Sequence, residues 1–286
     1  MKYYLSLICG VLIWAVINGL ALRGVHVPSA VLGTFMSLVG VLLFLPWLLI
    51  KKPKFTKIEI KLLCLLGVAA ALNNSFFYAA IKFETVKGSQ AFLIHYFSSI
   101  LAVLWISCIP AFKEKLDIGS ILGIIMGAVG LIIATGNDWL KHEFWMYLAL
   151  LSAFFYSFEI VLSRRVSDVN IHPNVSSFAK LFFQALLMPF VGVYLLNQQF
   201  VIPEKHLFVQ IIGAGFLLFL SFILVFSGLK KVPAKHFAVI GYLDRIGAIA
   251  IFALVFGERF GWNVWLGGAL VLLAEIPILI SSRKAI

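Results

Sequence analysis

The sequence predicts an all-α integral membrane protein with ten transmembrane helices, arranged as two inverted repeats of five helices each. The chain of 286 residues is 62% hydrophobic and 12% charged, and a soluble domain of this length has no way to bury so much apolar surface. The apolar residues fall into ten runs of roughly twenty residues, the length that crosses a bilayer. The second half of the chain also repeats patterns of the first.

Short connections join the runs, without a soluble domain, a low-complexity segment or a linker long enough to separate independent domains. We interpret the first run as a retained span, because it is longer than the apolar region of a signal peptide and lacks a convincing cleavage site. The ten spans are expected at approximately residues 3–22, 28–50, 60–81, 88–111, 118–135, 144–163, 174–196, 207–229, 234–256 and 262–281.

Basic residues in the loops set the expected orientation in the membrane. With a cytoplasmic N-terminus, the inside segments hold fifteen Lys and Arg residues, the outside segments hold six, and the other two of the 23, Lys180 and Arg245, lie within spans. This positive-inside bias predicts that both termini are cytoplasmic, in the inner (plasma) membrane of a prokaryote. The net charge of +11 therefore belongs to loops at the bilayer surface, and we expect no binding of nucleic acid.

The two halves, residues 1–138 and 139–286, each form one five-helix repeat with the same order of motifs. FYAAIKFETVKGSQAF in the first half corresponds to VFSGLKKVPAKHFAVIGYLDRIGAIAIF in the second, and each leads to an acidic residue and a Gly-rich span. Matching positions are Lys82 and Lys230, Glu114 and Glu258, Gly123 and Gly267, and Trp14 and Tyr156. Because five spans per half is odd, the copies are expected to point in opposite directions, as they do in many secondary transporters.

These motifs also resemble those of a known family. The stretches YAAIKF and FSGLKK ending the third and eighth spans, the acid closing the fourth and ninth (KEK and GER), and the Gly-rich fifth and tenth resemble the EamA-type drug/metabolite transporter superfamily. The resemblance covers nearly the whole chain. It implies a central cavity lined mainly by spans 1–4 and 6–9, peripheral spans 5 and 10, and transport of small metabolites. The family's usual mid-span proline is absent, and His95-Tyr96 and Asp244-Arg245 stand in its neighbourhood.

Asp244 and Arg245 lie at the middle of the ninth run, where a charge normally faces a protein interior or a wet cavity. Small residues of this run follow one side at spacings of three and four, and Arg245 falls on that side. One interpretation is that one or both contact a charged or zwitterionic substrate, or a coupling proton. The other is a structural ion pair, for example between Arg245 and Glu275.

Glu159 in the sixth span and Lys180 in the seventh are expected at similar depth, near the cytoplasmic side. They form one ion pair, or Lys180 extends to the inner surface. Alternatively, Glu159 is a cation-binding or protonatable gate on an inner vestibule.

Aromatic residues stand at interior positions of several spans. Trp14 and Tyr156 occupy matching places in the two halves, and Tyr78, Tyr96 and Tyr242 also lie within spans. Aromatic residues at helical spacing usually pack against one another. A Trp/Tyr set near an acid is also how proteins hold organic cations, so these side chains are candidates for a substrate cage.

His95 and the adjacent amides Asn73 and Asn74 are polar groups within otherwise apolar runs. His95 is either a hydrogen-bonded interior histidine or a proton-coupling group, since its imidazole titrates near neutral pH. The amides either link helices or contact substrate.

Together these features predict a secondary transporter that moves a small metabolite across the inner membrane by alternating access. Acids, a base and aromatic residues in the expected cavity favour an amino acid or another zwitterionic or amine compound; the alternative is an organic-cation (choline-like) permease. The candidate substrate-binding residues are Trp14, Asn74, Tyr78, His95, Tyr96, Tyr156, Glu159, Tyr242, Asp244 and Arg245.

Other classes of function fit the sequence less well. An intramembrane enzyme would need a nucleophile–base or metal constellation, which the sequence lacks. The three cysteines lie in apolar runs without ligand-like spacing, so we expect neither a metal nor a cofactor. A structural or receptor-like bundle does not account for the inverted repeat. The expected partners are a small-molecule substrate and the lipid bilayer, with proton coupling open, and no pattern specifies an oligomeric state.

Overall fold

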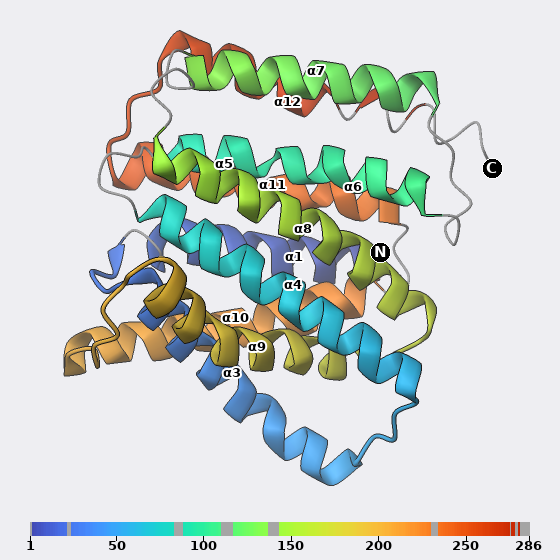
Figure 1. Cartoon of the computed structure of the whole chain (residues 1–286), viewed down its shortest axis with the longest axis vertical. Coiled ribbons are helices and arrows are strands. Elements are labelled where there is room, and N and C mark those ends of the chain that lie inside the picture. The colour runs from blue at the N-terminus through green and yellow to red at the C-terminus, as the bar shows by residue number, and fades with distance from the viewer. Residues whose placement is uncertain are drawn as a thin grey trace.

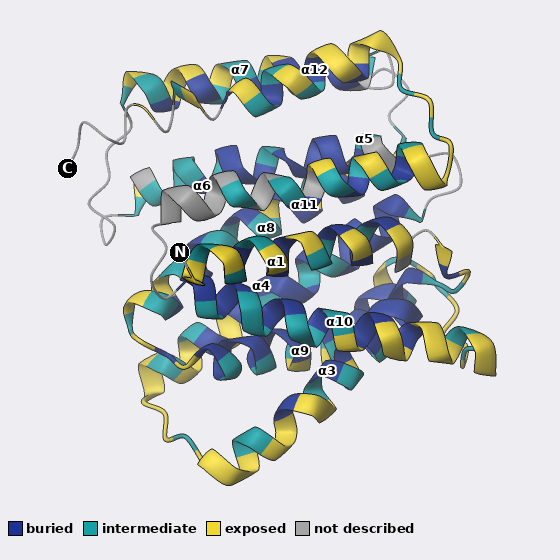
Figure 2. Ribbon diagram, turned by 180° about the vertical axis from the view of Figure 1, so that it is seen from behind, coloured by how far each residue is buried: buried dark blue, intermediate teal, exposed yellow. Residues whose placement is uncertain are grey.

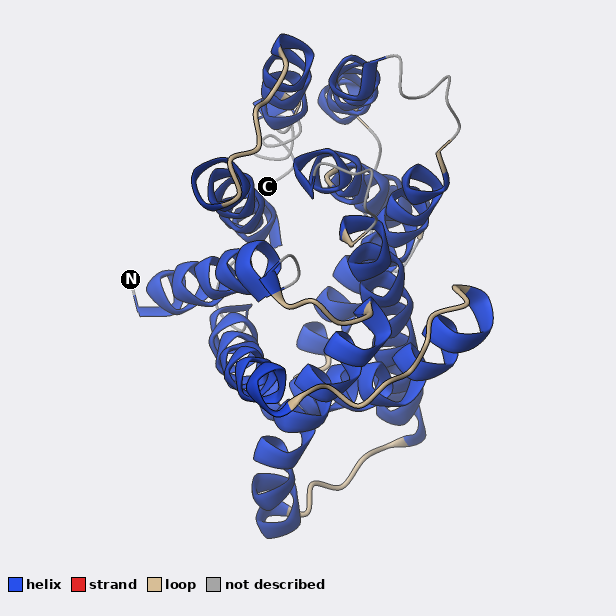
Figure 3. Cartoon of the chain, turned by 90° about the vertical axis from the view of Figure 1, so that its left-hand side faces the viewer, coloured by secondary structure: helices blue, strands red, loops and turns tan. Residues whose placement is uncertain are grey.

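A computed structural model shows the chain as a bundle of helices (Figure 1). The structure describes residues 2–21, 24–82, 88–109, 117–136, 143–229 and 234–274, together with 276, 277 and 280. Within these residues it contains helices and their connections, without a strand (Figure 3). The expectation of an all-α protein is confirmed.

The helices follow one another in the order that the apolar runs predict. Two of the expected spans, the first and the seventh, end in a π-helical turn. In chain order the elements are α1 (Lys2–Val16), η1 (Ile17–Ala21), α3 (Ser29–Lys51), α4 (Lys57–Ile81), α5 (Gly88–His95), α6 (Phe97–Cys108), α7 (Ile118–Thr135), α8 (Phe144–Asp168), α9 (Pro173–Phe190), η4 (Val191–Leu195), α10 (Lys205–Leu229), α11 (Ala234–Val255) and α12 (Trp262–Leu273).

Each expected span overlaps one helix or two consecutive helical segments. In the described part of the chain, six helices are long and apolar enough to cross a membrane: Lys2–Leu20, Ser29–Lys51, Lys57–Ile81, Phe144–Asp168, Pro173–Leu195 and Lys205–Leu229. Four further apolar stretches are shorter: Gln90–Ile106, Ile118–Ala134, Ile246–Val255 and Trp262–Leu273. The multi-pass membrane class is thereby supported, and the count of ten crossings stays a prediction.

The fourth expected span is interrupted at Tyr96, which separates α5 from α6. The hydroxyl of Ser98 donates to the carbonyl of His95 at 2.6 Å, and the amide of Ser99 bonds to the carbonyl of Tyr96 at 3.2 Å. A serine side chain that takes a backbone carbonyl competes with the helical hydrogen-bond ladder. The hydrogen-bond pattern is therefore disturbed at Tyr96, whose backbone keeps α-helical dihedral angles of φ −58° and ψ −29°.

The contacts between helices are symmetric with respect to the two halves. Replacing each helix of a packed pair by its counterpart in the other half gives another packed pair. Helix α1 packs on α10, as α4 packs on α8. The contact of α4 with α9 corresponds to that of α10 with α3, and the contact of α1 with α11 to that of α8 with α5 and α6. Helices α3 and α9 pack together, as do α7 and α12, which form a separate pair at one edge of the bundle (Figure 1).

Apolar side chains cover much of the outside of the protein, and a few charged side chains are buried in its interior. Ile50 is 77% exposed and Leu254 is 86% exposed, whereas Glu159, Lys180 and Asp244 are each less than 9% exposed. Exposed residues run along the outward faces of the helices (Figure 2). This distribution suits a protein surrounded by hydrocarbon, in which the costly polar groups are gathered in the interior.

Helices α3 and α10 approach closely at a glycine. A Cβ atom on Gly215 would lie 2.8 Å from the carbonyl oxygen of Met36 and 2.7 Å from Cβ of Val39. Two residues earlier on the same helix, Gly213 is exposed and a Cβ atom there would meet nothing within 4 Å. Of these two glycines, Gly215 is therefore the one whose missing side chain lets two backbones come together.

We predict that Gly215→Ala lowers the melting temperature of the detergent-purified protein, because overpacking an interface costs about 1–3 kcal/mol. Gly213→Ala is the matched control and should be neutral or stabilising, since alanine favours the helix by about 0.5–1 kcal/mol over glycine. Thermal unfolding measures both variants. Equal melting temperatures for the two would contradict the close approach of α3 and α10.

Candidate functional site

A small cavity lies between the two halves of the chain. Its volume is about 50 Å³; because one water needs about 10–15 Å³ of such space, the cavity has room for a few water molecules. Both halves contribute to its wall, which is formed by Trp14, Ile17, Asn18, Asn73, Asn74, Phe77, Tyr78, His95, Tyr156, Glu159, Lys180, Leu218, Phe222 and Asp244.

Helical spacing brings Tyr156 and Glu159 of α8 to this wall, with Ser152 buried one turn before Tyr156. Ser152, Tyr156 and Glu159 are separated by four and three residues, so they share one face of the helix. Ser152 and Glu159 are buried, while Tyr156 is half-buried. The same face therefore presents a hydroxyl, an aromatic ring and a carboxylate to the interior.

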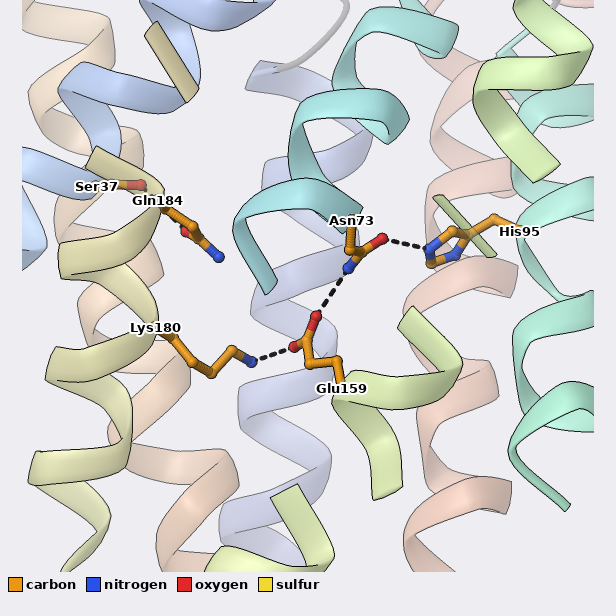
Figure 4. Close-up of polar contacts among 6 residues, drawn as sticks. All are labelled: Ser37, Asn73, His95, Glu159, Lys180 and Gln184. Carbon is orange, nitrogen blue, oxygen red and sulfur yellow. Dashed lines mark hydrogen bonds and ion pairs between the residues drawn. The ribbon is translucent and has the colours of Figure 1, made fainter. Parts of the chain in front are cut away.

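Glu159 on α8 and Lys180 on α9 form a buried ion pair (Figure 4). The carboxylate is 4% exposed and the lysine 3% exposed. Of the two structural interpretations of these residues, the ion pair is the one that the structure contains, and Lys180 does not extend to the inner surface. A gating role for Glu159 stays a prediction.

Asn73 on α4 connects this ion pair to His95 (Figure 4). Its amide nitrogen donates to Oε2 of Glu159 at 2.9 Å, and its oxygen accepts from the Ser152 hydroxyl at 2.8 Å. Nε2 of His95 lies 3.1 Å from the same oxygen. Because this oxygen only accepts, the network assigns the proton to Nε2 of His95.

The imidazole of His95 is stacked between two aromatic rings. Its centroid lies 4.3 Å from that of Phe77 and 4.8 Å from that of Tyr156. The ring is 6% exposed and hydrogen-bonded to Asn73. The structure therefore places His95 as a hydrogen-bonded interior residue at the cavity wall, and its proton coupling stays a prediction.

Three aromatic rings surround the ammonium group of Lys180. Nζ lies 4.4 Å from the ring centroid of Phe222, 5.4 Å from that of Phe226 and 5.8 Å from that of Trp14. These distances are in the range of cation–π attraction. Trp14 thus belongs to an aromatic cage, which in this structure holds the protein's own lysine. The substrate cage of Trp14 and Tyr156 stays a prediction.

The indole of Trp14 also carries a hydrogen-bond donor beside the cavity. Its Nε1 is buried and has no hydrogen-bond partner within the described residues. Buried polar groups are normally hydrogen-bonded.

Asp244 on α11 faces the interior, as the sequence predicted. It is 8% exposed, lines the cavity, and its Oδ1 accepts from the amide of Asn18 at 3.1 Å. Asn18 lies in the π-helical turn η1 and is a cavity residue that sequence reasoning missed. The side chains of Tyr242 and Arg245 lie outside the described residues, and so does Glu275.

The remaining candidates divide between the cavity and the core. Asn74 and Tyr78 line the cavity together with the residues above. Tyr96 does not; it is 2% exposed and packs in a cluster with Leu93, Ala134, Val264 and Val271. Adjacent helical residues project in different directions, which leaves His95 at the cavity wall and Tyr96 in a core shared with α7 and α12.

A second, smaller cavity adjoins the first. It measures about 10 Å³ and shares Trp14, Tyr156, Glu159 and Lys180 with the larger one. Its other wall residues lie on α8 and α10: Ile160, Ser163, Val225, Phe226 and Leu229. The ion pair and two aromatic residues therefore line both cavities, and the rest of the smaller one is mainly apolar.

We predict that Glu159→Gln lowers the melting temperature strongly, because removing one partner of a buried pair costs about 3–5 kcal/mol. The double variant Glu159→Gln/Lys180→Met removes both charges and should recover most of the loss. The control is Arg164→Gln, which breaks an exposed pair with Asp168 at 3.2 Å and should cost about 1 kcal/mol or less. A double variant no more stable than Glu159→Gln would contradict the pairing.

Comparison with known proteins supports the architecture. One solved structure, titled only "Crystal structure of protein", superposes with a TM-score of 0.66 and 17% sequence identity over 99% of this chain and 100% of that one. That likeness concerns the fold alone, and no curated protein matches the sequence. The EamA-like transporter family matches twice, over residues 1–136 and 143–280. The resemblance seen in the sequence is confirmed: the chain belongs to the EamA-like transporter family and is a multi-pass membrane transporter of small solutes.

Proposed function

We propose that the protein is a secondary transporter with ten spans that carries a small amine-bearing solute by alternating access, with amino acids and other zwitterions favoured. The observation that carries this proposal is the buried polar cavity between the halves, which has the carboxylate of Asp244 in its wall. Groups of this polarity are expensive inside a membrane protein and usually mark a solute pathway.

The packing of the halves supports the alternating-access part of the proposal. The helix pairs of one half correspond to those of the other when the halves are exchanged, which is the relation expected of an inverted repeat. Rocking of one half against the other would open the cavity first to one side and then to the other. In this structure the cavity has room for only a few waters, so the helices around it would have to move apart to admit a solute.

The wall chemistry supports the amine part of the proposal. Asp244 supplies a carboxylate for an ammonium group, and Asn18, Asn74, Tyr78 and Tyr156 add polar or aromatic surface around it. Arg245 follows Asp244 directly in sequence and is the base that we propose for the carboxylate of a zwitterion. In the proposed orientation, both termini lie on the cytoplasmic side of the inner membrane.

An organic-cation permease is the second candidate, and one observation favours it. Glu159, Trp14, Phe222 and Phe226 surround an ammonium group, that of Lys180. A carboxylate with aromatic rings is the arrangement that recognises choline-like cations. This candidate does not need Arg245, so substitution of Arg245 separates the two.

A thermal-shift screen of the purified protein with amino acids, amines and nucleosides tests the proposal. We expect an amine-bearing compound to raise the melting temperature, since a ligand that binds only the folded state stabilises it. Asp244→Asn should weaken this binding by about tenfold or more, the usual consequence of losing a charge-assisted hydrogen bond. Uptake of the same compound into proteoliposomes then measures transport.

Two further variants complete the design. Asp168→Asn makes the same chemical change in a partly exposed surface pair and should leave the binding unchanged. Arg245→Gln should weaken an amino acid and spare a choline-like cation. A ligand that stabilises the parent and Asp244→Asn equally would remove Asp244 from the site, and stabilisation by nucleosides alone would overturn the amine class.

A further inference from the structure

We propose that the position of the Lys180 ammonium group is itself a cation-binding site, filled by the protein's own side chain in this structure and by the ammonium group of a solute when Lys180 withdraws. The inference rests on the proposed transport of amines and assigns a specific subsite to it. Lys180 would then be a tethered competitor of the solute.

The surroundings of Nζ have the composition of an ammonium site. Oε1 of Glu159 pairs with Nζ, and the rings of Phe222, Phe226 and Trp14 lie at 4.4, 5.4 and 5.8 Å from it. Carboxylates and aromatic faces attract a desolvated cation for different physical reasons, the first by charge and the second by the ring quadrupole. Together they suit any primary or methylated ammonium group of the same size.

The site is built without help from Lys180. The carboxylate comes from α8, Trp14 comes from α1, and both phenylalanines come from α10, whereas Lys180 lies on α9. Trp14 and Phe222 also pack edge to face, with their centroids 5.6 Å apart. If the lysine side chain leaves, the rings therefore keep one another in place.

Asn73 holds the carboxylate from the other side. Its amide donates to Oε2 of Glu159 at 2.9 Å, and its own orientation is fixed by Ser152 at 2.8 Å and His95 at 3.1 Å. Oε1 is thereby aimed at the cage whether or not Lys180 is present. Such preorganisation is what distinguishes a binding site from a chance contact.

The site is also reachable from the solute pathway. Lys180 and Glu159 line both the central cavity and the smaller cavity beside it. A solute in the central cavity therefore meets the ion pair directly. Lys180 gives the empty carrier a counter-charge for Glu159, because a buried carboxylate without a cation is strongly destabilising.

Lys180→Ala tests the inference by emptying the site without changing its walls. The substitution removes the atoms from Cγ to Nζ, which have the size and shape of propylammonium. We expect propylammonium to raise the melting temperature of Lys180→Ala, and calorimetry to show binding at least about tenfold tighter than to Lys180→Ala/Glu159→Gln, because a buried charge pair holds it. Methylammonium and hexylammonium should bind more weakly, and uncharged butanol should have no comparable effect.

Gln184→Ala is the matched control on the same helix. Gln184 lies one turn beyond Lys180, is 1% exposed, and its Oε1 accepts from the Ser37 hydroxyl at 3.1 Å (Figure 4). Its truncation opens a comparable hole that has neither the carboxylate nor the cage. Neither this variant nor the parent should show a response to propylammonium like that of Lys180→Ala.

Two results would overturn the inference. One is equal binding of propylammonium to Lys180→Ala and to the double variant. The other is a Lys180→Ala protein that aggregates to the same extent with and without propylammonium, because a site built by the remaining residues should be refilled and the fold recovered. Neither measurement uses transport. If Lys180→Ala binds propylammonium but the parent protein transports no amine, the proposed function is refuted and the ammonium site is not.

Discussion

Two opposite charges, on Glu159 and Lys180, are buried inside this bundle. The surrounding hydrocarbon cannot solvate either of them. Each charge would cost several kcal/mol alone in such surroundings, and the neighbouring residues are arranged to prevent that. Asn73 donates to one carboxylate oxygen, Lys180 pairs with the other, and aromatic rings of α1 and α10 face the ammonium group. The pair thereby ties together helices of both halves, and the cavity forms where they meet.

The lipid surroundings shape the rest of the molecule as well. Lipid replaces water outside, so the outward apolar faces need no partner, while the interior combines a large apolar core with a few buried polar groups. Helix packing shows another consequence of the lipid surroundings. No hydrophobic force drives helices together in lipid, and the small residue Gly215 lets α3 and α10 approach closely. The corresponding helix pairs of the two halves then place one polar space at their common interface.

The sequence predicts the parts of this structure that depend on local pattern. Apolar runs of bilayer length locate the helical segments, and a mid-run aspartate predicts that Asp244 faces the interior. The pairing of Glu159 with Lys180 could be anticipated from their depth. The aromatic cage around Lys180 could not be anticipated from the sequence. Phe222 and Phe226 are two of 27 phenylalanines, and only tertiary packing distinguishes these two from the others. The position of Asn18 likewise depends on a π-helical turn that no apolar period reveals, and that of Tyr96 on packing against α7 and α12.

The location of the ion pair on consecutive helices has a consequence for the synthesis of the protein. Helices α8 and α9 are joined by the short connection 169–172, so Glu159 and Lys180 reach the insertion machinery within one helical hairpin. A lone charge at a helix centre opposes insertion by about 2.5–3.5 kcal/mol, whereas a hairpin can enter with its two charges already neutralising each other. The first half is synthesised earlier, so α4 already carries Asn73, the hydrogen-bond donor to Glu159, when this hairpin is made.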